Sequence, residues 1–309
     1  MVANKAPSTF EPGVTSLAMK FVPSFATRKT RQARDVLVQA FTRYFSSGCP
    51  DTSSAFMKAR YAHILRHNIT AVTDIAALEV AGAFSIITNS APTAFWLLYH
   101  IFSDPAALAD CRRELAPLVH EKDGVCEMDV DAVRTACPTL HSAFHEVMRY
   151  YGVAQSIRAV LEDHRLDENT LLRKGSMVMM PAKVQHFDPA VWGADVNRFD
   201  YKRFMKSASD GAGSGFDSKT SSRGAFRGFG GGLHMCPGRH FAMNEILSLA
   251  ALLILRFDMV PAGDGKWPVI QTDTLSSKGS AIIMPDNDLD VVLCPRDNRK
   301  WAISSTMAQ

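Results

Sequence analysis

The stretch FGGGLHMCPGRHFA, residues 229–242, constrains this chain more than any other part of it. Three glycines stand shortly before Cys236, and Pro237 and Gly238 separate it from a long apolar run. This order predicts that Cys236 lies at or just before the N-terminus of a helix. Unpaired amides and the positive end of the helix dipole lower the pKa of a thiol placed there. Cys236 is therefore a candidate ligand or nucleophile.

Other roles for Cys236 stay open at this point. A lone cysteine is often a small buried apolar side chain. Zinc is an alternative because His234 and His240 lie close by, although no second Cys/His pair does. The glycines lack the spacing of a phosphate-binding loop. They allow a sharp turn whose amides point at the sulfur, and Phe229 can exclude water from that turn. A shielded thiolate of this kind is what a haem iron binds.

The bulk composition is that of an ordinary globular protein. The 309 residues are 47% hydrophobic, which is enough for one large core or two smaller ones. The 34 basic and 31 acidic side chains leave a formal charge of +3, so nucleic acid is not an expected partner. The six cysteines lie far apart, which favours a reducing compartment over a disulfide framework.

The order of elements indicates a mainly α protein with small β-sheets. Apolar residues at helical spacing predict helices at 29–45, 53–68, 74–102, 104–119, 138–151 and 241–257. Short apolar runs between turn residues predict small strands within 157–185, and residues 281–296 are predicted to form a hairpin. The segment KDGVCEMDVD, residues 122–131, is predicted to be a loop. The Ser/Gly-rich residues 206–225 are predicted to be a flexible loop.

One segment, residues 75–102, is long and apolar enough to be considered as a membrane span. It carries Glu79, a polar Thr-Asn-Ser run, Pro92 and His100, and a spanning helix rarely places so much polarity at its centre. We therefore expect a long helix buried in the protein. Residues 1–13 show no basic segment followed by an apolar one, so no secretory signal is expected there.

The residues around Cys236 resemble the haem-binding signature of the cytochrome P450 family. The matching residues, with single-residue gaps, are Phe229, Gly230, Gly232, His234, Cys236, Pro237 and Gly238. This resemblance implies that Cys236 is the axial ligand of a haem iron, and that the phenylalanine and the three glycines form the loop that holds the cofactor. It also implies the C-terminal portion of the family's fold, organised as a single haem-thiolate domain over residues 1–309.

A second match lies on the helix predicted at 138–151. Glu146 and Arg149 stand three residues apart, which by itself is an ordinary pair worth roughly a few tenths of a kcal/mol. In the family, this Glu-x-x-Arg motif pairs with an arginine from a segment that WGADVNRFDYKRF resembles. Arg203 is the matching residue, although Tyr-Lys replaces the usual Pro-Glu before it. The resemblance implies a structural clasp of Glu146, Arg149 and Arg203 that holds the cysteine loop against the core.

Two basic residues match family positions that receive the haem propionates. His234 stands two residues before Cys236, at the basic position of the signature. Arg158, in SIRAV, follows the helix that carries the Glu-x-x-Arg motif. Both side chains are therefore expected to bind carboxylates of the cofactor, and the alternative for each is a surface cation.

The long helix at 74–102 is implied to cross the oxygen-binding face of the haem. Most family members carry an acid followed by a threonine there, and this pair relays protons. Alignment through FWLLYHIFSDP places Thr88 and Asn89 at these positions, so an amide replaces the alcohol and the carboxylate is absent. An amide can hold water or a substrate oxygen but does not titrate near neutral pH. Pro92, one turn later, predicts a local opening of the helix.

The string NSAPTAFW, residues 89–96, resembles one branch of the family, prostacyclin synthase and the sterol 7α- and 12α-hydroxylases. The segments CPGRHFA and FRGFGGG resemble fungal members. The resemblance implies a haem-dependent monooxygenase of secondary metabolism that hydroxylates a bulky apolar lipid, sterol or terpenoid-like substrate with O2. The implied cofactors of such an enzyme are haem b (iron protoporphyrin IX) and NADPH, whose electrons a partner NADPH–cytochrome P450 reductase delivers. A haem-thiolate isomerase of a peroxide substrate and a non-catalytic remnant are the alternatives.

The resemblance runs from about residue 30 to the C-terminus, with residues 206–225 unmatched. Intact family members have a longer N-terminal part with a membrane anchor, a further propionate-binding segment and much of the substrate roof. This chain is therefore expected to be N-terminally truncated and to lack the anchor. Membrane association, on the cytosolic face of the endoplasmic reticulum, is expected for the intact member. The substrate stays undefined because its choice depends on the roof.

Overall fold

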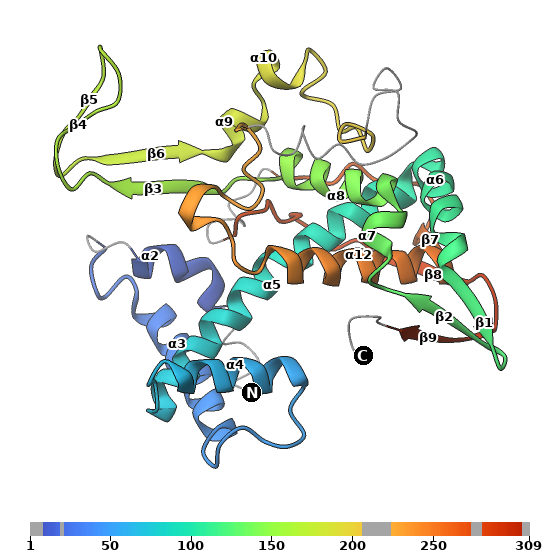
Figure 1. The fold of residues 1–309 in the computed structure, drawn as a ribbon, viewed down its shortest axis with the longest axis horizontal. Helices are drawn as coiled ribbons and strands as arrows, with labels where there is room; N and C mark the ends of the chain where they lie inside the picture. Colours follow the sequence, from blue (N-terminus) through green and yellow to red (C-terminus); the bar gives the residue numbers. More distant parts are fainter. Residues whose placement is uncertain (1–8, 19–21, 206–223, 273–279, 305–309) are drawn as a thin grey trace. The chain divides into compact units, whose positions relative to one another are not determined.

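The computed structural model of the protein describes residues 9–18, 22–205, 224–272 and 280–304 (Figure 1). The chain divides into two compact units, and each is described by itself. The first comprises Met1–Asn89 with Thr274–Ser280, and the second comprises Ser90–Asp273 with Ala281–Gln309. The single domain expected over residues 1–309 stays a prediction. The loop predicted at 206–225 lies outside the described residues, apart from its last two positions.

The described part of the first unit is helical. Its elements are η2 (Glu11–Gly13), α2 (Val14–Ala18), α3 (Arg28–Tyr44), α4 (Ala55–Arg66) and the first part of α5 (Val72–Ser103). The helices predicted at 29–45 and 53–68 are thus confirmed. Ser54 caps α4, because its hydroxyl accepts a hydrogen bond from the Met57 amide (3.2 Å). An ion pair between Arg60 Nε and the buried Glu79 carboxylate (3.1 Å) joins α4 to α5.

Helix α5 is continuous from Val72 to Ser103 although it contains Pro92. The local opening predicted at this proline is therefore limited to one missing helix hydrogen bond, because proline has no backbone N–H to donate. Helix α5 is long and apolar enough to cross a membrane. The core helix of a soluble protein also meets this criterion of length and composition. Its residues Ile75 and Trp96 are each 1% exposed, so the helix contributes to the cores of both units.

The second unit holds the remaining helices of the described chain. They are α6 (Pro105–Leu115), η3 (Ala116–Leu118), α7 (Val133–Ala136), α8 (Pro138–Tyr150), α9 (Ala182–His186), α10 (Pro189–Trp192), η5 (Gly232–His234) and α12 (Arg239–Arg256). The helices predicted at 138–151 and 241–257 are confirmed as α8 and α12. The start predicted for α6 is also confirmed, because Asp104 Oδ1 accepts hydrogen bonds from the amides of Ala106 (2.9 Å) and Ala107 (3.2 Å).

Within the described residues, four small sheets complete the second unit. Their strands are β1 (Val119–Lys122), β2 (Val125–Asp129), β3 (Gln155–Ala159), β4 (His164–Arg165), β5 (Leu171–Leu172), β6 (Met177–Pro181), β7 (Phe257–Pro261), β8 (Val291–Pro295) and β9 (Lys300–Ser304). The sheet orders are β1-β2-β9, β3-β6, β4-β5 and β7-β8. All pairs are antiparallel except β2 with β9, which is parallel. The mainly α class with small β-sheets is confirmed.

Two local predictions are wrong. Residues 122–131, predicted to be a loop, contain the Asp123-Gly124 turn and β2, which pairs with the adjacent β1 as a hairpin and, on its other edge, with β9 near the end of the described chain. Residues 281–296, predicted to be a hairpin, contain β8, which pairs with the distant strand β7, with Val291 opposite Pro261. Turn residues and alternation report local geometry, and they carry no information about a partner far along the sequence.

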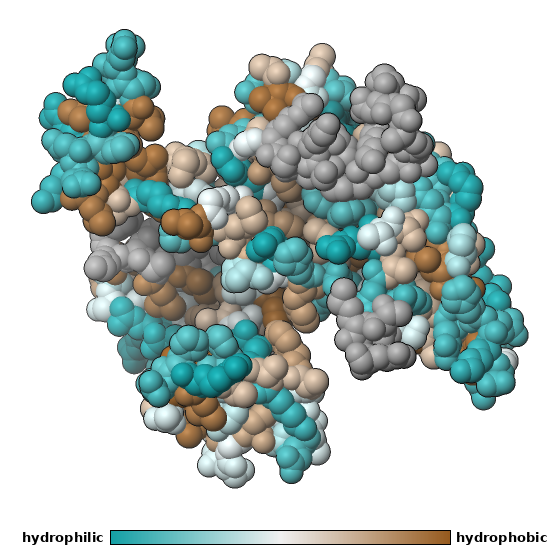
Figure 2. Space-filling model, viewed as in Figure 1, coloured by the Kyte–Doolittle hydropathy of each residue, from teal (hydrophilic) through white to brown (hydrophobic). Residues whose placement is uncertain are grey.

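The arm formed by β3 and β6 is poorly buried. Figure 2 shows apolar side chains at its surface. Ile157 is 48% exposed, Met177 is 70% exposed and Met179 is 53% exposed. In the described residues this ribbon has two strands, so each strand keeps one unpaired edge.

The core of the second unit surrounds α12, against which α6, α7 and α8 pack (Figure 1). The buried residues of α12 are Met243, Ile246, Leu247, Ala250, Ala251, Ile254 and Leu255. Trp96 of α5 stacks on Tyr151 with ring centroids 3.9 Å apart, and its indole N–H donates to the Ile283 carbonyl (2.7 Å). The helix that follows the cysteine loop is therefore anchored in the centre of this unit.

Three histidines are buried in the second unit: His141, His145 and His186. Burial lowers the pKa of His141 to about 3 and the pKa of His145 and His186 to about 4, from the usual value of 6.5. The unfolded chain therefore takes up these protons near pH 6.5, whereas the folded chain stays neutral until the pH is far lower. Stability contributed by the neutral rings is lost as the pH falls through this window.

Burial also lowers the pKa of His100 to about 3. We predict that the free energy of unfolding falls by about 1.4 kcal/mol per pH unit for each of these four histidines as the pH drops below about 6.5. Urea unfolding measured from neutral pH down to about pH 5 checks this, because carboxylates titrate mainly below that range. His145→Asn keeps a donor for the His141 carbonyl and should reduce the slope by about one quarter. A stability independent of pH in this range would contradict the prediction.

Candidate functional site

The cysteine loop, residues 226–238, connects the described part of the chain before it to α12. It turns at Gly230 and Gly232, whose φ angles of 77° and 63° lie in the left-handed region that favours glycine. The Gly230 amide donates to the Arg227 carbonyl (3.0 Å) and closes the first turn. Phe229 packs against the core, with its ring centroid 6.2 Å from that of Phe144 on α8. The two left-handed glycines therefore shape this loop.

Cys236 lies two residues before Gly238, the N-cap of α12. Its amide donates to the Phe229 carbonyl (2.9 Å), which fixes its backbone, while its side chain is exposed. The exposed thiol argues against a buried structural cysteine. A Cβ atom added at Gly238 would lie 3.9 Å from the Cys236 sulfur, so glycine keeps the space beside the thiol open.

Two other expectations for the thiol are not met in the described residues. There the Cys236 sulfur accepts no hydrogen bond from a backbone amide, and the amides of Gly230, Met235 and Cys236 donate to carbonyl oxygens of the loop. Within the same residues, no three His, Cys, Asp or Glu side chains come together as metal ligands. His234, His240 and Cys236 therefore do not form a zinc-binding site in the described residues.

Glu146, Arg149 and Arg203 are in contact in the second unit. Glu146 and Arg149 are both fully buried on α8. Arg149 Nε and Nη2 donate to the two oxygens of the Glu146 carboxylate at 2.7 Å and 2.8 Å, a bidentate pair. Arg203 Nε donates to Glu146 Oε1 (3.1 Å), as does the Asp200 amide (3.0 Å). We use the name clasp for Glu146, Arg149 and Arg203.

The second half of the Arg203 guanidinium binds Asp195, which sequence reasoning missed. Arg203 Nη1 and Nη2 each lie 3.2 Å from a carboxylate oxygen of Asp195. The hydrogen bonds from Arg203 hold the pKa of Asp195 below its usual range. Arg203 Nη1 also donates to the Trp192 carbonyl (3.2 Å). An acidic residue eight positions before the third arginine was the available sequence signal.

His186 is the other residue that sequence reasoning missed. It ends α9, it is fully buried, and its carbonyl accepts a hydrogen bond from Arg149 Nη1 (2.8 Å). Its ring nitrogens contact the Arg149 carbonyl and the Arg227 amide. The sequence signal was a histidine two residues before Asp188, the N-cap of the next helix, but nothing local indicates that its partners lie on α8 and in the cysteine loop.

The two candidate propionate residues lie in different elements of the second unit. Arg158 is half-buried on β3, and its Nη1 donates to the Ile157 carbonyl (2.8 Å). His234 ends η5 inside the cysteine loop and is exposed. Both are cations or potential cations that can reach an anion, and no described contact joins either of them to the clasp.

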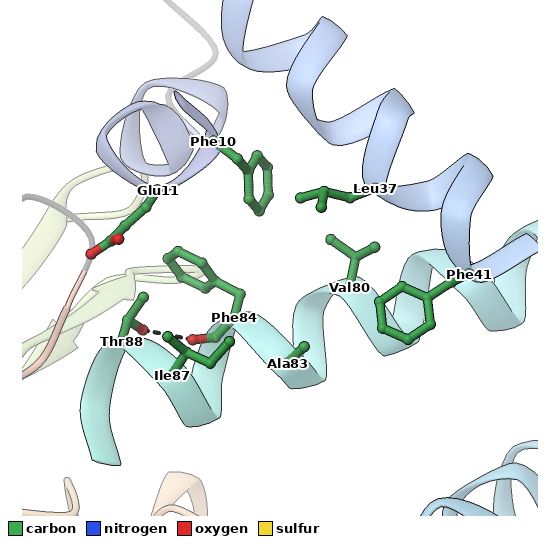
Figure 3. A pocket seen from close by; sticks show the side chains of 9 residues that line it. All are labelled: Phe10, Glu11, Leu37, Phe41, Val80, Ala83, Phe84, Ile87 and Thr88. Carbon is green, nitrogen blue, oxygen red and sulfur yellow. Dashed lines mark hydrogen bonds between the residues drawn. The ribbon is translucent and has the colours of Figure 1, made fainter. Parts of the chain in front are cut away.

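Thr88 and Asn89 lie on α5 in the first unit. Thr88 is 1% exposed, and its hydroxyl donates to the Phe84 carbonyl one turn earlier (2.8 Å; Figure 3). Asn89 Nδ2 donates to the Ser85 carbonyl (2.9 Å). Both side chains therefore bond to the backbone of their own helix.

Thr88 also lines a small apolar cavity of about 90 Å³ within the first unit (Figure 3). The other lining residues are Phe10, Glu11, Leu37, Phe41, Val80, Ala83, Phe84 and Ile87. Burial raises the pKa of the Glu11 carboxyl above its usual value. Apart from Glu11 and Thr88, the side chains around this cavity offer only van der Waals contact, so it fits a hydrocarbon group.

Comparison with known proteins gives one family. A family model described as Cytochrome P450 matches residues 18–285. The chain is 34% identical to cytochrome P450 monooxygenase nodJ of Hypoxylon pulicicidum, over 94% of this chain and 57% of that protein. It is 30% identical to a cytochrome P450 monooxygenase of Gibberella zeae (92% and 55%) and 25% identical to cholesterol 7-alpha-monooxygenase of Cricetulus griseus (65% and 41%).

A solved structure with the same fold is the retinoic-acid-bound cyanobacterial CYP120A1, with a TM-score of 0.70 and 20% sequence identity. The match covers 95% of this chain and 63% of that one. The chain thus spans somewhat more than half the length of the curated relatives that match it over most of its residues. The fold likeness and the family match agree with each other.

We predict that Glu146→Ala lowers the free energy of unfolding by about 3–5 kcal/mol, because it leaves Arg149 buried without its counter-charge. Urea unfolding of the variant and the parent chain measures this. Arg34→Ala is the control, since it removes the exposed Arg34–Asp35 pair (2.9 Å) and should cost less than about 1 kcal/mol. Equal losses in the two variants would show that the clasp does not stabilise the fold.

Proposed function

Since the chain belongs to the cytochrome P450 family, as the sequence predicts, we propose that it carries the haem-thiolate site of a monooxygenase. The reaction is hydroxylation of a bulky apolar substrate with O2. The observation that supports this most directly is the exposed Cys236 thiol, held on a loop with two left-handed glycines immediately before a buried helix. The named relatives are monooxygenases, which favours the same reaction here.

Family membership implies a haem cofactor, and the residues present fit it. A thiolate is the soft donor that iron accepts, and Cys236 presents it to the outside of the loop. Gly238 leaves room next to the sulfur that any side chain would take. When bound, haem supplies the activation of O2 for insertion of one oxygen atom into a C–H bond.

The other loop residues have supporting roles in this proposal. Phe229 shields one side of the loop from water through its contact with Phe144. Gly230 and Gly232 allow the turn that brings the sulfur to the surface. Arg158 and His234 bind the two propionates, which are carboxylates that a guanidinium or an imidazolium can hold by charge-assisted hydrogen bonds. The clasp keeps the elements before the loop in place.

Thr88 and Asn89 are the polar pair that we propose for the oxygen side. Since neither titrates near neutral pH, they can orient a water molecule or a substrate oxygen but cannot supply a proton from a carboxyl group. The apolar cavity beside Thr88, about 90 Å³, has room for a hydrocarbon group but not for a whole bulky substrate. A sterol or terpenoid-like lipid is the proposed class, and the relative named cholesterol 7-alpha-monooxygenase favours it.

The reaction also requires electrons from a partner. Inserting one oxygen atom of O2 and reducing the other to water consumes two electrons and two protons per turnover. We propose NADPH as the source and NADPH–cytochrome P450 reductase as the carrier, at the cytosolic face of the endoplasmic reticulum membrane. The fungal relatives favour a role in secondary metabolism.

We predict that the chain expressed with haem gives the thiolate-type absorbance band in a reduced, CO-treated difference spectrum, and that Cys236→Ser loses that band. The reason is that serine oxygen is a poor ligand for this iron. Cys294→Ser is the matched control, because Cys294 is also exposed but lies on β8. An unchanged band in the Cys236 variant would show that another residue ligates the iron.

The monooxygenase reaction also predicts the source of the product oxygen. With isotopically labelled O2, NADPH and a reductase, the hydroxyl group of the product should carry the label, and omitting NADPH should abolish product. Formation of product from a peroxide substrate without electrons would instead support an isomerase. That outcome is compatible with Thr88, which stands where most family members carry an acid, and it would contradict the proposed hydroxylation.

A further inference from the structure

His186 connects α8 to the cysteine loop through both nitrogens of its ring. Nδ1 lies 3.0 Å from the Arg149 carbonyl oxygen, and Nε2 lies 2.9 Å from the backbone nitrogen of Arg227. The ring is fully buried and stacks on Phe226, with centroids 5.7 Å apart and an interplanar angle of 21°. One side chain thus bonds to an arginine of the clasp and to the residue that opens the glycine turn.

These two partners fix the protonation of the ring. A carbonyl oxygen can only accept, so Nδ1 must carry the hydrogen that it donates to Arg149. A backbone N–H can only donate, so Nε2 must present its lone pair to Arg227. His186 is therefore neutral and in a single tautomer. It is a donor at one end and an acceptor at the other, and few side chains of this size are both.

We propose that His186 is a positioning residue for the cysteine loop. Its ring transmits the position of the clasp, through the Arg149 carbonyl, to the backbone at Arg227, and so sets where the turn that carries Cys236 begins. The importance of this position for cofactor binding rests on the role proposed above for Cys236. His186 acts through the loop backbone, since its ring nitrogens contact the Arg149 carbonyl and the Arg227 amide.

The contacts after Arg227 carry this position along the loop. The Arg227 carbonyl accepts from the Gly230 amide (3.0 Å), and the Phe229 carbonyl accepts from the Cys236 amide (2.9 Å). The Arg227 side chain is held as well, since its Nε donates to Gln185 Oε1 (3.2 Å) on α9. A displacement of the Arg227 backbone therefore moves a short series of hydrogen-bonded turns that ends at the thiol.

Close packing leaves the ring little freedom to shift. A Cβ atom added at Gly152 would lie 3.2 Å from Cε1 and Nδ1 of His186. On the loop side, a Cβ atom added at Gly228 would lie 3.0 Å from the Met148 Cβ atom on α8. The ring and the loop are thus closely packed against α8 and the residues that follow it, so only substitutions close to His186 in size can test the hydrogen bonds separately from the packing.

Two substitutions by amide side chains can test the two hydrogen bonds of His186 one at a time. His186→Asn can place an N–H near the position of Nδ1 and keep the bond to Arg149, but it offers no acceptor to Arg227. His186→Gln can place an oxygen near the position of Nε2 and keep the acceptor for Arg227. His145→Asn is the matched control, because His145 is also buried and also packs on Phe226, while its Nδ1 contacts the His141 carbonyl.

The measurement is amide hydrogen exchange of the full chain, resolved at Arg227 and compared with amides inside α8. We expect exchange at Arg227 to be about tenfold faster in His186→Asn, and within about threefold of the parent in His186→Gln and His145→Asn. Equal behaviour of the two His186 variants would overturn the proposal. Faster exchange throughout α8 would also overturn it, because His186 would then support the whole fold and not the loop.

A second readout follows the loop in the haem-loaded chain. The thiolate-type band should decay faster on storage in His186→Asn than in His186→Gln or His145→Asn. If the three variants decay alike, the position of Arg227 does not matter to the ligand and the proposal fails. This failure is distinct from failure of the proposed function, which is decided by the band of Cys236→Ser and not by exchange at Arg227.

Discussion

The buried carboxylate of Glu146 determines how several elements of the second unit are placed, because they must supply its hydrogen-bond partners. A charge without solvent has to be paired and hydrogen-bonded, and Glu146 receives donors from Arg149, Arg203 and the Asp200 amide. The arginines then need acceptors for their remaining donors, and they find them in the carbonyl groups of His186 and Trp192. Satisfying one charge therefore fixes α8, α9, α10 and the segment up to residue 203 relative to one another.

The geometry around the thiol depends on that arrangement. Glycines at 230 and 232 give the loop its shape, yet a shape alone does not determine where the loop lies. Its position comes from contacts with residues that the clasp already holds, namely His186 at Arg227 and Phe144 at Phe229. The exposed Cys236 thiol is thus supported by a set of buried polar contacts, in which the charges have a structural role.

Helices were predictable from the sequence because their signals are local. The Asp104-Pro105 cap and the apolar spacing of α3, α8 and α12 act within a few residues. The partner of β8 was missed because β7 lies far from it in the sequence, whereas β2 was missed although its turn with β1, Asp123-Gly124, is a local hairpin signal. The site divides in the same way. The glycine-cysteine signature is contiguous in sequence, whereas Asp195 and His186 act on partners from other elements, and no spacing rule identifies them.

The parallel register of β9 on β2 has a consequence for synthesis of the chain. Val125 lies opposite Lys300, so the hairpin of β1 and β2 leaves the ribosome long before the strand that covers its outer edge. During that interval an unprotected edge is available to other nascent chains. Truncation before β9 would make this exposure permanent, and such a product should be more prone to aggregate than to lose its helices.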